Sequence, residues 1–251
     1  MNRPLRRRSP LLGTAAASLL LAALAPAANF IAPDPMFVRA AEEARRTSSR
    51  FWSGNDLPGD WSHPCPIHVS PADHAGSGST SFRFDRGEVS GWSMTLCGPR
   101  AVLLDDVLPH EVDHMVRASL VRRPIPRWLD EGCATLMESP ASHDHCRRRL
   151  ATCLNRPVTA AFLDAADYPS DPAECDRLYC VGFSLVEFLL DRQGPETLLK
   201  FQADPRAPSQ KLAEFYGFNP SSLDAAWRRW VEDRSRLGTT CLLHGGAGHA
   251  A

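Results

Sequence analysis

The chain has 251 residues, of which 43% are hydrophobic and 23% are charged. This is the composition of an ordinary globular protein, and it excludes a largely disordered chain and a multi-span membrane protein. The formal charge is −1, from 28 basic and 29 acidic residues, so the basic excess typical of nucleic-acid-binding proteins is absent. We therefore expect no nucleic-acid partner.

Residues 1–28 have the pattern of a secretory signal peptide. Four arginines within residues 3–8 precede an uncharged apolar run over residues 11–24, and Ala25-Pro26-Ala27 follows with small residues at the cleavage positions. The run is shorter than the roughly 20 residues of a transmembrane helix. Removing the four arginines would leave 24 basic against 29 acidic residues, a net charge of −5. We expect a secreted, periplasmic or cell-envelope protein without stable membrane insertion; an uncleaved signal anchor is the alternative.

The cysteine content agrees with export, because an even set of cysteines in an oxidising compartment suggests disulfides. The eight cysteines are Cys65, Cys97, Cys133, Cys146, Cys153, Cys175, Cys180 and Cys241. None is spaced as in a structural zinc knuckle. We predict Cys65 paired with Cys97, both beside predicted strands, and Cys146 paired with Cys153. The alternative for several of them is a free buried thiol.

The first part of the mature chain alternates short apolar runs with Gly-rich and Pro-rich segments. Its predicted elements, in chain order, are a helix over 35–50, a loop over 54–66, a strand over 67–69, a turn region over 73–79, strands over 80–84 and 89–96 joined by a hairpin turn at 85–88, and, over 101–104, either a further short strand or the lead-in to a helix.

The rest of the chain is predicted to be mainly helical. The helices are 109–120, 126–138, 180–192, 209–216 and 220–236, and three of them begin with a proline, which suits a first helical turn. Residues 238–251 are small and Gly-rich and suggest a flexible tail. We therefore predict an α+β fold, a small mixed or antiparallel sheet followed by a helical region, in one domain over 29–237 with an α/β part (29–104) and a helical part (105–237).

Residues 110–114 read His-Glu-Val-Asp-His. On a helix, positions i and i+4 lie on one face, so His110 and His114 can offer two imidazole nitrogens to one zinc ion. Glu111 is placed to reach a water on the metal rather than the metal itself, as in a hydrolase where zinc acidifies the water and a carboxylate takes its proton. A surface helix with two solvated histidines is the alternative.

A catalytic zinc needs a third protein ligand. One class of zinc peptidases uses a third histidine six residues after the second, but here that position is Leu120. Another class takes a glutamate from the following helix, and Glu131 lies seventeen residues after His114. The short segment 121–125 allows the second helix to return and bring Glu131 to the two histidines.

Together these motifs resemble the gluzincin metallopeptidases of the MA clan, and in particular the uncharacterised secreted bacterial proteins with a peptidase-MA-like domain. The residues that carry the resemblance are His-Glu-Val-Asp-His at 110–114 and Trp-Leu-Asp-Glu-Gly-Cys-Ala at 128–134, with further similar stretches at 65–67, 80–89 and 179–185. The resemblance covers roughly residues 35–232. It implies a zincin-like fold in which an edge strand, expected here within 89–96, lines the cleft.

The resemblance also implies roles for individual residues: His110, His114 and Glu131 as ligands of one Zn²⁺ per chain, and Glu111 as the general base. Two departures are notable. The Gly-x-Met-x-Asn element of gluzincin aminopeptidases is absent, so exopeptidase specificity is not supported. The carboxylate found four residues after the glutamate ligand in thermolysin-like enzymes is Thr135 here, so a hydrogen-bond partner for His110 comes from elsewhere or is the Thr135 hydroxyl.

Other residues have open interpretations. Tyr179 is our candidate donor to the oxyanion of the scissile carbonyl, with a packing tyrosine as the alternative. Asp113 lies on a different face from the ligands and is solvated or salt-bridged. Cys133 is expected to face away from the ion, in the core or in a disulfide. His143 and His145 form a second metal site or belong to a solvated loop.

Three tryptophans, Trp52, Trp61 and Trp92, either line a substrate groove or belong to the core. For the protein as a whole we expect a secreted zinc peptidase, with endopeptidase specificity, acting on a peptide or protein substrate. The alternatives are a non-catalytic exported zinc-fold binding module and a zinc hydrolase of a non-peptide amide. The oligomeric state is left open.

Overall fold

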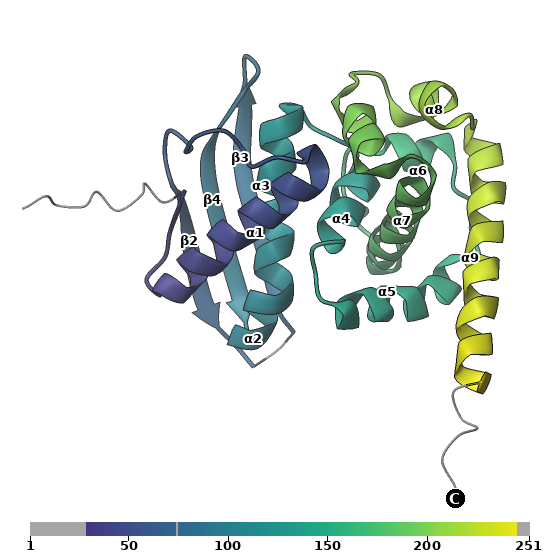
Figure 1. Cartoon of the computed structure of the whole chain (residues 1–251), viewed down its shortest axis with the longest axis horizontal. Coiled ribbons are helices and arrows are strands. Elements are labelled where there is room, and N and C mark those ends of the chain that lie inside the picture. Colours follow the sequence, from purple (N-terminus) through teal and green to yellow (C-terminus); the bar gives the residue numbers. More distant parts are fainter. Residues whose placement is uncertain (1–28, 74, 245–251) are drawn as a thin grey trace, which may run out of the picture.

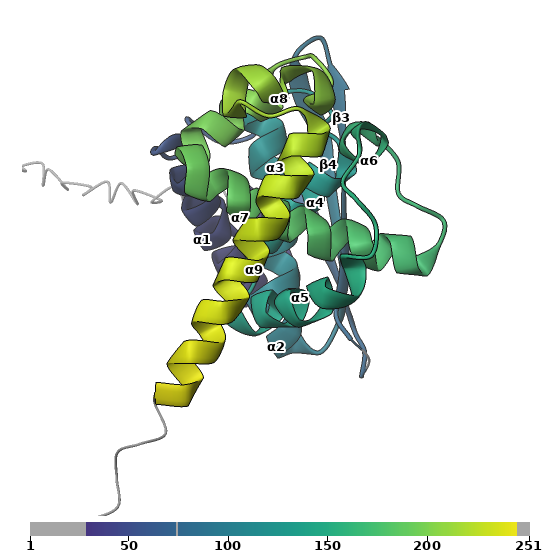
Figure 2. The same cartoon turned by 90° about the vertical axis from the view of Figure 1, so that its right-hand side faces the viewer.

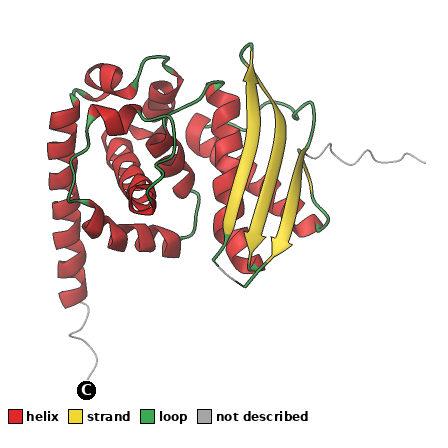
Figure 3. Cartoon of the chain, turned by 180° about the vertical axis from the view of Figure 1, so that it is seen from behind, coloured by secondary structure: helices red, strands yellow, loops and turns green. Residues whose placement is uncertain are grey.

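The computed structural model describes residues 29–73 and 75–244, so the predicted signal peptide lies outside the described residues. The fold is α+β, as predicted: a small sheet is followed by a mainly helical region (Figure 1). Helices α1 and α3 lie on one face of the sheet, and the opposite face is seen without a covering helix among the described residues (Figure 3). None of the helices in the described ranges is long and apolar enough for a membrane span.

The sheet has the strand order β1-β2-β4-β3. Its strands are β1 (Phe30–Ile31), β2 (Cys65–Pro71), β3 (Ser77–Asp85) and β4 (Glu88–Gly98). β2 pairs in parallel with β1 and β4, whereas β3 and β4 form an antiparallel hairpin. The turn between β3 and β4 places Arg86 and Gly87 at positive φ, as two-residue hairpin turns of the favoured type require. The predicted hairpin is therefore confirmed.

The edge strand next to the helical region is β3, not the predicted segment 89–96. That segment belongs to β4, which lies between β2 and β3 because β2 adds to its free side with Ile67 opposite Met94. Hairpin patterns show that two strands pair but not which of them takes a third neighbour. Trp92, Met94 and Leu96 are buried at alternating positions, as expected for a strand with one face toward the core.

The helices are α1 (Pro35–Ser53), α2 (Arg100–Val102), the π-helical turn η1 (Leu103–Val107), α3 (Leu108–Val121), α4 (Arg127–Thr135), α5 (Pro140–Cys153), α6 (Ala160–Asp164), α7 (Pro172–Ala203), α8 (Pro208–Tyr216) and α9 (Pro220–His244). Residues 101–104 are thus the lead-in to a helix. α5 was missed because its charged sequence buries only Cys146, Leu150 and Cys153. α9, which crosses the helical region in Figure 2, continues to His244, beyond the predicted end at Arg236.

Two glycines set the crossing of α4 and α7. A Cβ on Gly132 would lie 2.5 Å from the carbonyl of Gly182, and a Cβ on Gly182 would lie 2.4 Å from the backbone oxygen of Trp128. Only glycine permits this backbone-to-backbone approach. The Trp128 indole then fixes α4 further by donating to the Leu163 carbonyl at 2.8 Å. α4 is therefore held rigidly against α7.

The tryptophans belong to the core rather than to a groove. Trp52 is buried and its indole donates to Asp113 at 2.7 Å. Trp61 and Trp92 stack on each other with ring centroids 4.8 Å apart.

Both predicted disulfide pairings are wrong, since no two cysteines of the described residues are joined. The register of β2 and β4 separates Cys65 and Cys97 by about 16 Å along the strands, at about 3.3 Å per residue. Cys146 and Cys153 lie two turns apart on α5, or about 10 Å, whereas a disulfide needs Cα atoms within about 7 Å. Cys146 instead shares a hydrogen bond with the thiol of Cys180 on α7.

Candidate metal centre

The three predicted ligands meet in the structure. α3 presents His110 and His114 on one face, with imidazole centroids 4.9 Å apart. Oε2 of Glu131 on α4 lies 3.1 Å from Nε2 of His110 and 3.7 Å from Nε2 of His114. One ligand atom from each residue can be chosen so that all lie within 4.8 Å of one another, close enough to share a metal ion. Within the described residues this is the group that meets that criterion.

A carboxylate stands behind each histidine. Nδ1 of His110 lies 2.6 Å from Oε1 of Glu138, and Nδ1 of His114 lies 2.8 Å from Oδ1 of Asp130. When a carboxylate accepts a hydrogen bond from the Nδ1–H group, the neutral imidazole keeps its Nε2 lone pair for a metal, which is the usual arrangement of ligating histidines. Both histidines are thus oriented with Nε2 toward Glu131.

Neither of these supporting carboxylates was predicted. The sequence did contain an indication of Glu138: it lies seven residues, or two helical turns, after Glu131, and such positions share one face of a helix. Asp130 precedes Glu131 directly, and its role depends on how α4 faces α3. The hydroxyl of Thr135 bonds to the backbone oxygen of Glu131 at 2.9 Å. Of the two alternatives for the hydrogen-bond partner of His110, the Thr135 hydroxyl is therefore excluded, and the partner is Glu138.

The electrostatics of the cluster favour a cation. Burial would raise the pKa of Glu131, but the neighbouring His114 and the hydrogen bond with His110 outweigh it and hold that pKa far below its ordinary value. Burial lowers the pKa of His110, yet hydrogen bonds with Glu131 and Glu138 raise it to about 9. Positive charge is thus stabilised between the imidazoles and the carboxylates. A divalent cation among the Nε2 and Oε atoms satisfies the same carboxylates.

The His114 side of the cluster continues into a buried ionic network. Arg117, with no exposed surface, donates from Nε to Asp113 at 2.6 Å and from Nη2 to Asp130 at 2.8 Å. The other oxygen of Asp113 accepts from Ser48 at 2.6 Å and from Trp52 at 2.7 Å, both on α1. Asp113 was predicted to be either solvated or salt-bridged, and the structure shows that it is salt-bridged. Through these contacts it connects the cluster to the core.

Glu111 lies beside the ligand set rather than within it. It is buried in the first turn of α3 and faces the edge strand β3. A Cβ on Gly78 of β3 would lie 2.6 Å from Oε1 of Glu111, so glycine at that position gives the carboxylate its room. The Thr80 hydroxyl donates to the Glu111 backbone oxygen at 3.4 Å. The edge strand therefore fixes the position of Glu111.

Two tyrosines reach Glu131. Tyr179, the predicted donor, lies on α7 and hydrogen-bonds to Tyr168 and Glu131. Tyr168, from the loop between α6 and α7, is 47% exposed and donates its hydroxyl to Oε1 of Glu131. Burial raises the pKa of both phenols, and the carboxylate of Glu131 adds to the effect, so both stay protonated donors. Tyr168 was missed because a loop tyrosine has no sequence pattern that marks it.

The other candidates do not form a second centre in the described residues. His143 and His145 lie on α5, not in a loop. Nε2 of His143 bonds to the Thr135 backbone oxygen at 2.8 Å, and its ring stacks on Phe183. Cys133 is buried in the core, where its sulfur accepts from Gln202 at 3.8 Å.

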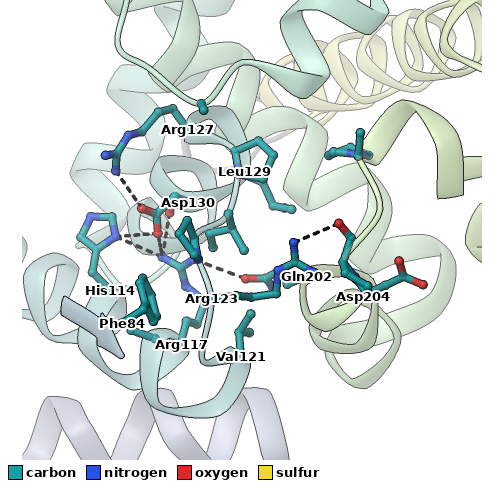
Figure 4. A pocket seen from close by; sticks show the side chains of 18 of the residues that line it. Phe84, His114, Arg117, Val121, Arg123, Arg127, Leu129, Asp130, Gln202 and Asp204 are labelled. Atoms are coloured by element: carbon teal, nitrogen blue, oxygen red, sulfur yellow. Dashed lines mark hydrogen bonds and ion pairs between the residues drawn. The ribbon is translucent and has the colours of Figure 1, made fainter. Parts of the chain in front are cut away.

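A cavity of about 510 Å³ adjoins the cluster at His114. It is lined by residues of β3, α3, α4 and the segment from α7 to α8, and it is open to solvent on one side. His114, Asp130, Arg117 and Arg127 lie together at one end, whereas Gln202 and Asp204 lie at the other (Figure 4). The cavity is therefore the place where a ligand can approach the histidine from the helical side.

Comparison of the chain with protein-family models, with curated proteins and with solved structures finds no match. The cluster and its surroundings are therefore the features of the molecule that point to a function.

Proposed function

We propose that the protein is an exported zinc-dependent peptidase of gluzincin type that cleaves internal peptide bonds. The observation that carries the proposal is the convergence of His110, His114 and Glu131, with a carboxylate behind each imidazole. A surface helix with two solvated histidines would have neither a buried third ligand nor these partners.

The donor set fits zinc. Two imidazole nitrogens and one carboxylate oxygen leave a fourth coordination position open, which is the composition of many catalytic zinc sites. When bound there, zinc supplies Lewis-acid polarisation of a carbonyl and acidification of water. His110, His114 and Glu131 would hold it.

The remaining residues have roles in proton transfer and charge stabilisation. Glu111, beside the ligands and not among them, is the general base: it takes a proton from the attacking water and passes it to the leaving amine. The protonated phenols of Tyr179 and Tyr168, both directed at Glu131, are the available donors to the developing oxyanion. The edge strand β3, with one side unpaired among the described strands, offers backbone groups to an extended peptide.

The test combines metal analysis with hydrolysis of a broad peptide library. The wild-type protein should bind one zinc per chain and cleave peptides, and removal of the metal by a chelator should abolish cleavage. Glu111→Gln should keep the zinc but lose activity by about 100-fold or more, because the base is gone while the ligands remain. Glu43→Gln, an exposed residue of α1, is the matched control.

Two results would contradict the proposal. Full activity of Glu111→Gln would remove Glu111 from the mechanism. One zinc per chain without turnover of any peptide would favour a non-catalytic zinc-fold binding module, or a hydrolase of a non-peptide amide, which amide substrates from cell-wall material would then distinguish.

A further inference from the structure

The cavity beside His114 contains a buried ammonium group. Lys211 of α8 lines this cavity and is only 3% exposed. Its Nζ donates to the backbone oxygen of Asp204 at 2.7 Å and lies 4.6 Å from the centroid of the Phe201 ring. An ammonium has three hydrogens to donate, so this contact leaves Lys211 with donor capacity.

A second cation lies near Lys211. Arg123, from the loop between α3 and α4, also lines the cavity and donates from Nη2 to the Pro205 backbone oxygen at 2.9 Å. The two cations repel each other, and this repulsion is one cause that lowers the pKa of Lys211. In the described part of the chain, neither is within ion-pair distance of a carboxylate.

The other charged groups of the cavity are already paired. The cations are Arg117 with Asp113 at 2.6 Å, Arg127 with Asp130 at 3.3 Å, and Arg206 with Asp204 at 2.6 Å. The remaining carboxylate, Asp164, accepts from the Ser209 backbone nitrogen at 2.9 Å and from its hydroxyl at 2.6 Å. The cavity therefore keeps two cations without an ion-pair partner among the described residues, although the more distant carboxylates of Asp204 and Asp164 partly offset the charge of Lys211.

We propose that this cavity binds a carboxylate of the substrate through Lys211 and Arg123. The inference depends on the proposed peptidase function, since it assigns that function a preference for acidic substrates. Burying a cation costs free energy unless an anion contacts it, so a carboxylate in direct contact with the buried Lys211 is what the cavity lacks. Apolar walls supplied by Phe84, Val121 and Leu129 suit the carbon chain that would carry it.

The position of the cavity limits this carboxylate to two sources in a peptide substrate. Because β3 and His114 both line the cavity, we expect a peptide that lies along β3 with its carbonyl at the candidate metal centre to extend an adjacent residue into the cavity. The carboxylate is then the side chain of a glutamate or aspartate beside the scissile bond, or the free C-terminus of a short peptide. The two sources share one chemistry, and blocking the C-terminus separates them.

The kinetic test uses peptide pairs that the wild-type protein cleaves, differing only by glutamate or glutamine beside the scissile bond, each with a free or an amidated C-terminus. We expect a kcat/KM ratio of about tenfold or more in favour of the extra carboxylate. Lys211→Met should lower kcat/KM for the glutamate peptide to the value for the glutamine peptide. Lys200→Met, the same substitution at an exposed lysine of α7, should retain the preference.

Lys211 is buried, so a second variant guards against misfolding. Arg123→Gln, in a half-buried loop position, should reduce the preference without unfolding the protein. A preference that survives in both Lys211→Met and Arg123→Gln, or equal rates for glutamate and glutamine peptides, would overturn the proposal.

A binding measurement separates this inference from the proposed function. Calorimetry should show that the metal-free protein binds glutarate and not the uncharged glutaramide, and that Lys211→Met loses the binding. If no peptide is cleaved, the peptidase proposal fails, but glutarate binding that depends on Lys211 still supports the carboxylate site. Absence of glutarate binding in a folded protein overturns it.

The pH dependence provides an independent signature. Burial, with the nearby Arg123 and Arg206, lowers the pKa of Lys211 to about 8 despite the opposing charges of Asp204 and Asp164. Below that pH the amine is charged and attracts a carboxylate; above it the amine is neutral and the attraction weakens. Glutarate affinity should therefore fall as the pH rises through about 8 in the wild type, and this step should be missing in Lys211→Met.

Discussion

His110 and His114 each donate a hydrogen bond from Nδ1, but the carboxylates that accept it belong to different parts of the fold. Glu138, the partner of His110, lies just beyond the end of α4 and also accepts from Ser142 at the start of α5. Asp130, the partner of His114, lies within α4 and is bound to the fully buried Arg117.

The difference shows that one candidate metal ligand, His114, is oriented by the core and the other, His110, by a local turn. On the His114 side, the chain of contacts runs from Asp130 through Arg117 to Asp113 and reaches α1, so positioning the ligand and folding the domain depend on the same groups. On the His110 side, Glu138 can be lost without breaking that chain. The two sides should therefore respond differently to substitution.

The largest effect is expected from Arg117→Met. It leaves Asp113 and Asp130 buried without their cation, so the metal-free protein should lose about 3–5 kcal/mol of stability in urea unfolding. Arg46→Met, which removes an exposed ion pair with Glu43 on α1, should cost less than about 1 kcal/mol. Equal losses in the two variants would show that the buried network does not support the fold.

A smaller effect, and a sharper comparison, comes from removing each supporting carboxylate. Asp130→Ala and Glu138→Ala should each weaken zinc affinity by about 10-fold to 100-fold, since an unsupported imidazole is a poorer ligand. Only Asp130→Ala should also destabilise the metal-free protein, because Arg117 loses one partner. Competition with a chromophoric chelator measures the zinc affinity, and urea unfolding measures the stability of the metal-free protein. Equal destabilisation by both variants would contradict the asymmetry.

The smallest effect is expected from Tyr168→Phe. The hydroxyl of this exposed tyrosine makes one of the hydrogen bonds to Glu131, so its removal should change zinc affinity by about 1 kcal/mol or less. Tyr216→Phe, at the end of α8, is the control for loss of a phenol oxygen, because the buried hydroxyl of Tyr216 has no hydrogen-bond partner among the described residues. A loss of affinity as large as that of Glu138→Ala would make Tyr168 part of the ligand support.

Patterns that repeat over a few residues were predictable. The i, i+4 spacing of His110 and His114 depends only on helix geometry, and the hairpin between β3 and β4 depends on alternation around an Arg-Gly turn. The α+β class follows from the same local periodicities. Glu131 was inferred because its helix follows the first after a short loop.

The rest was decided by packing between segments far apart in the chain. That β3 is the edge strand follows from where β2 joins the sheet, and the separation of Cys65 from Cys97 follows from the register of that pairing. The roles of Asp130 and Arg117 depend on how α4 rotates against α3. That Lys211 lacks an ion-pair partner among the described residues depends on where α8 meets the cavity. Local spacing determines which side chains share a face, whereas only the tertiary structure determines which faces meet, because burial and pairing energies act between elements and not along them.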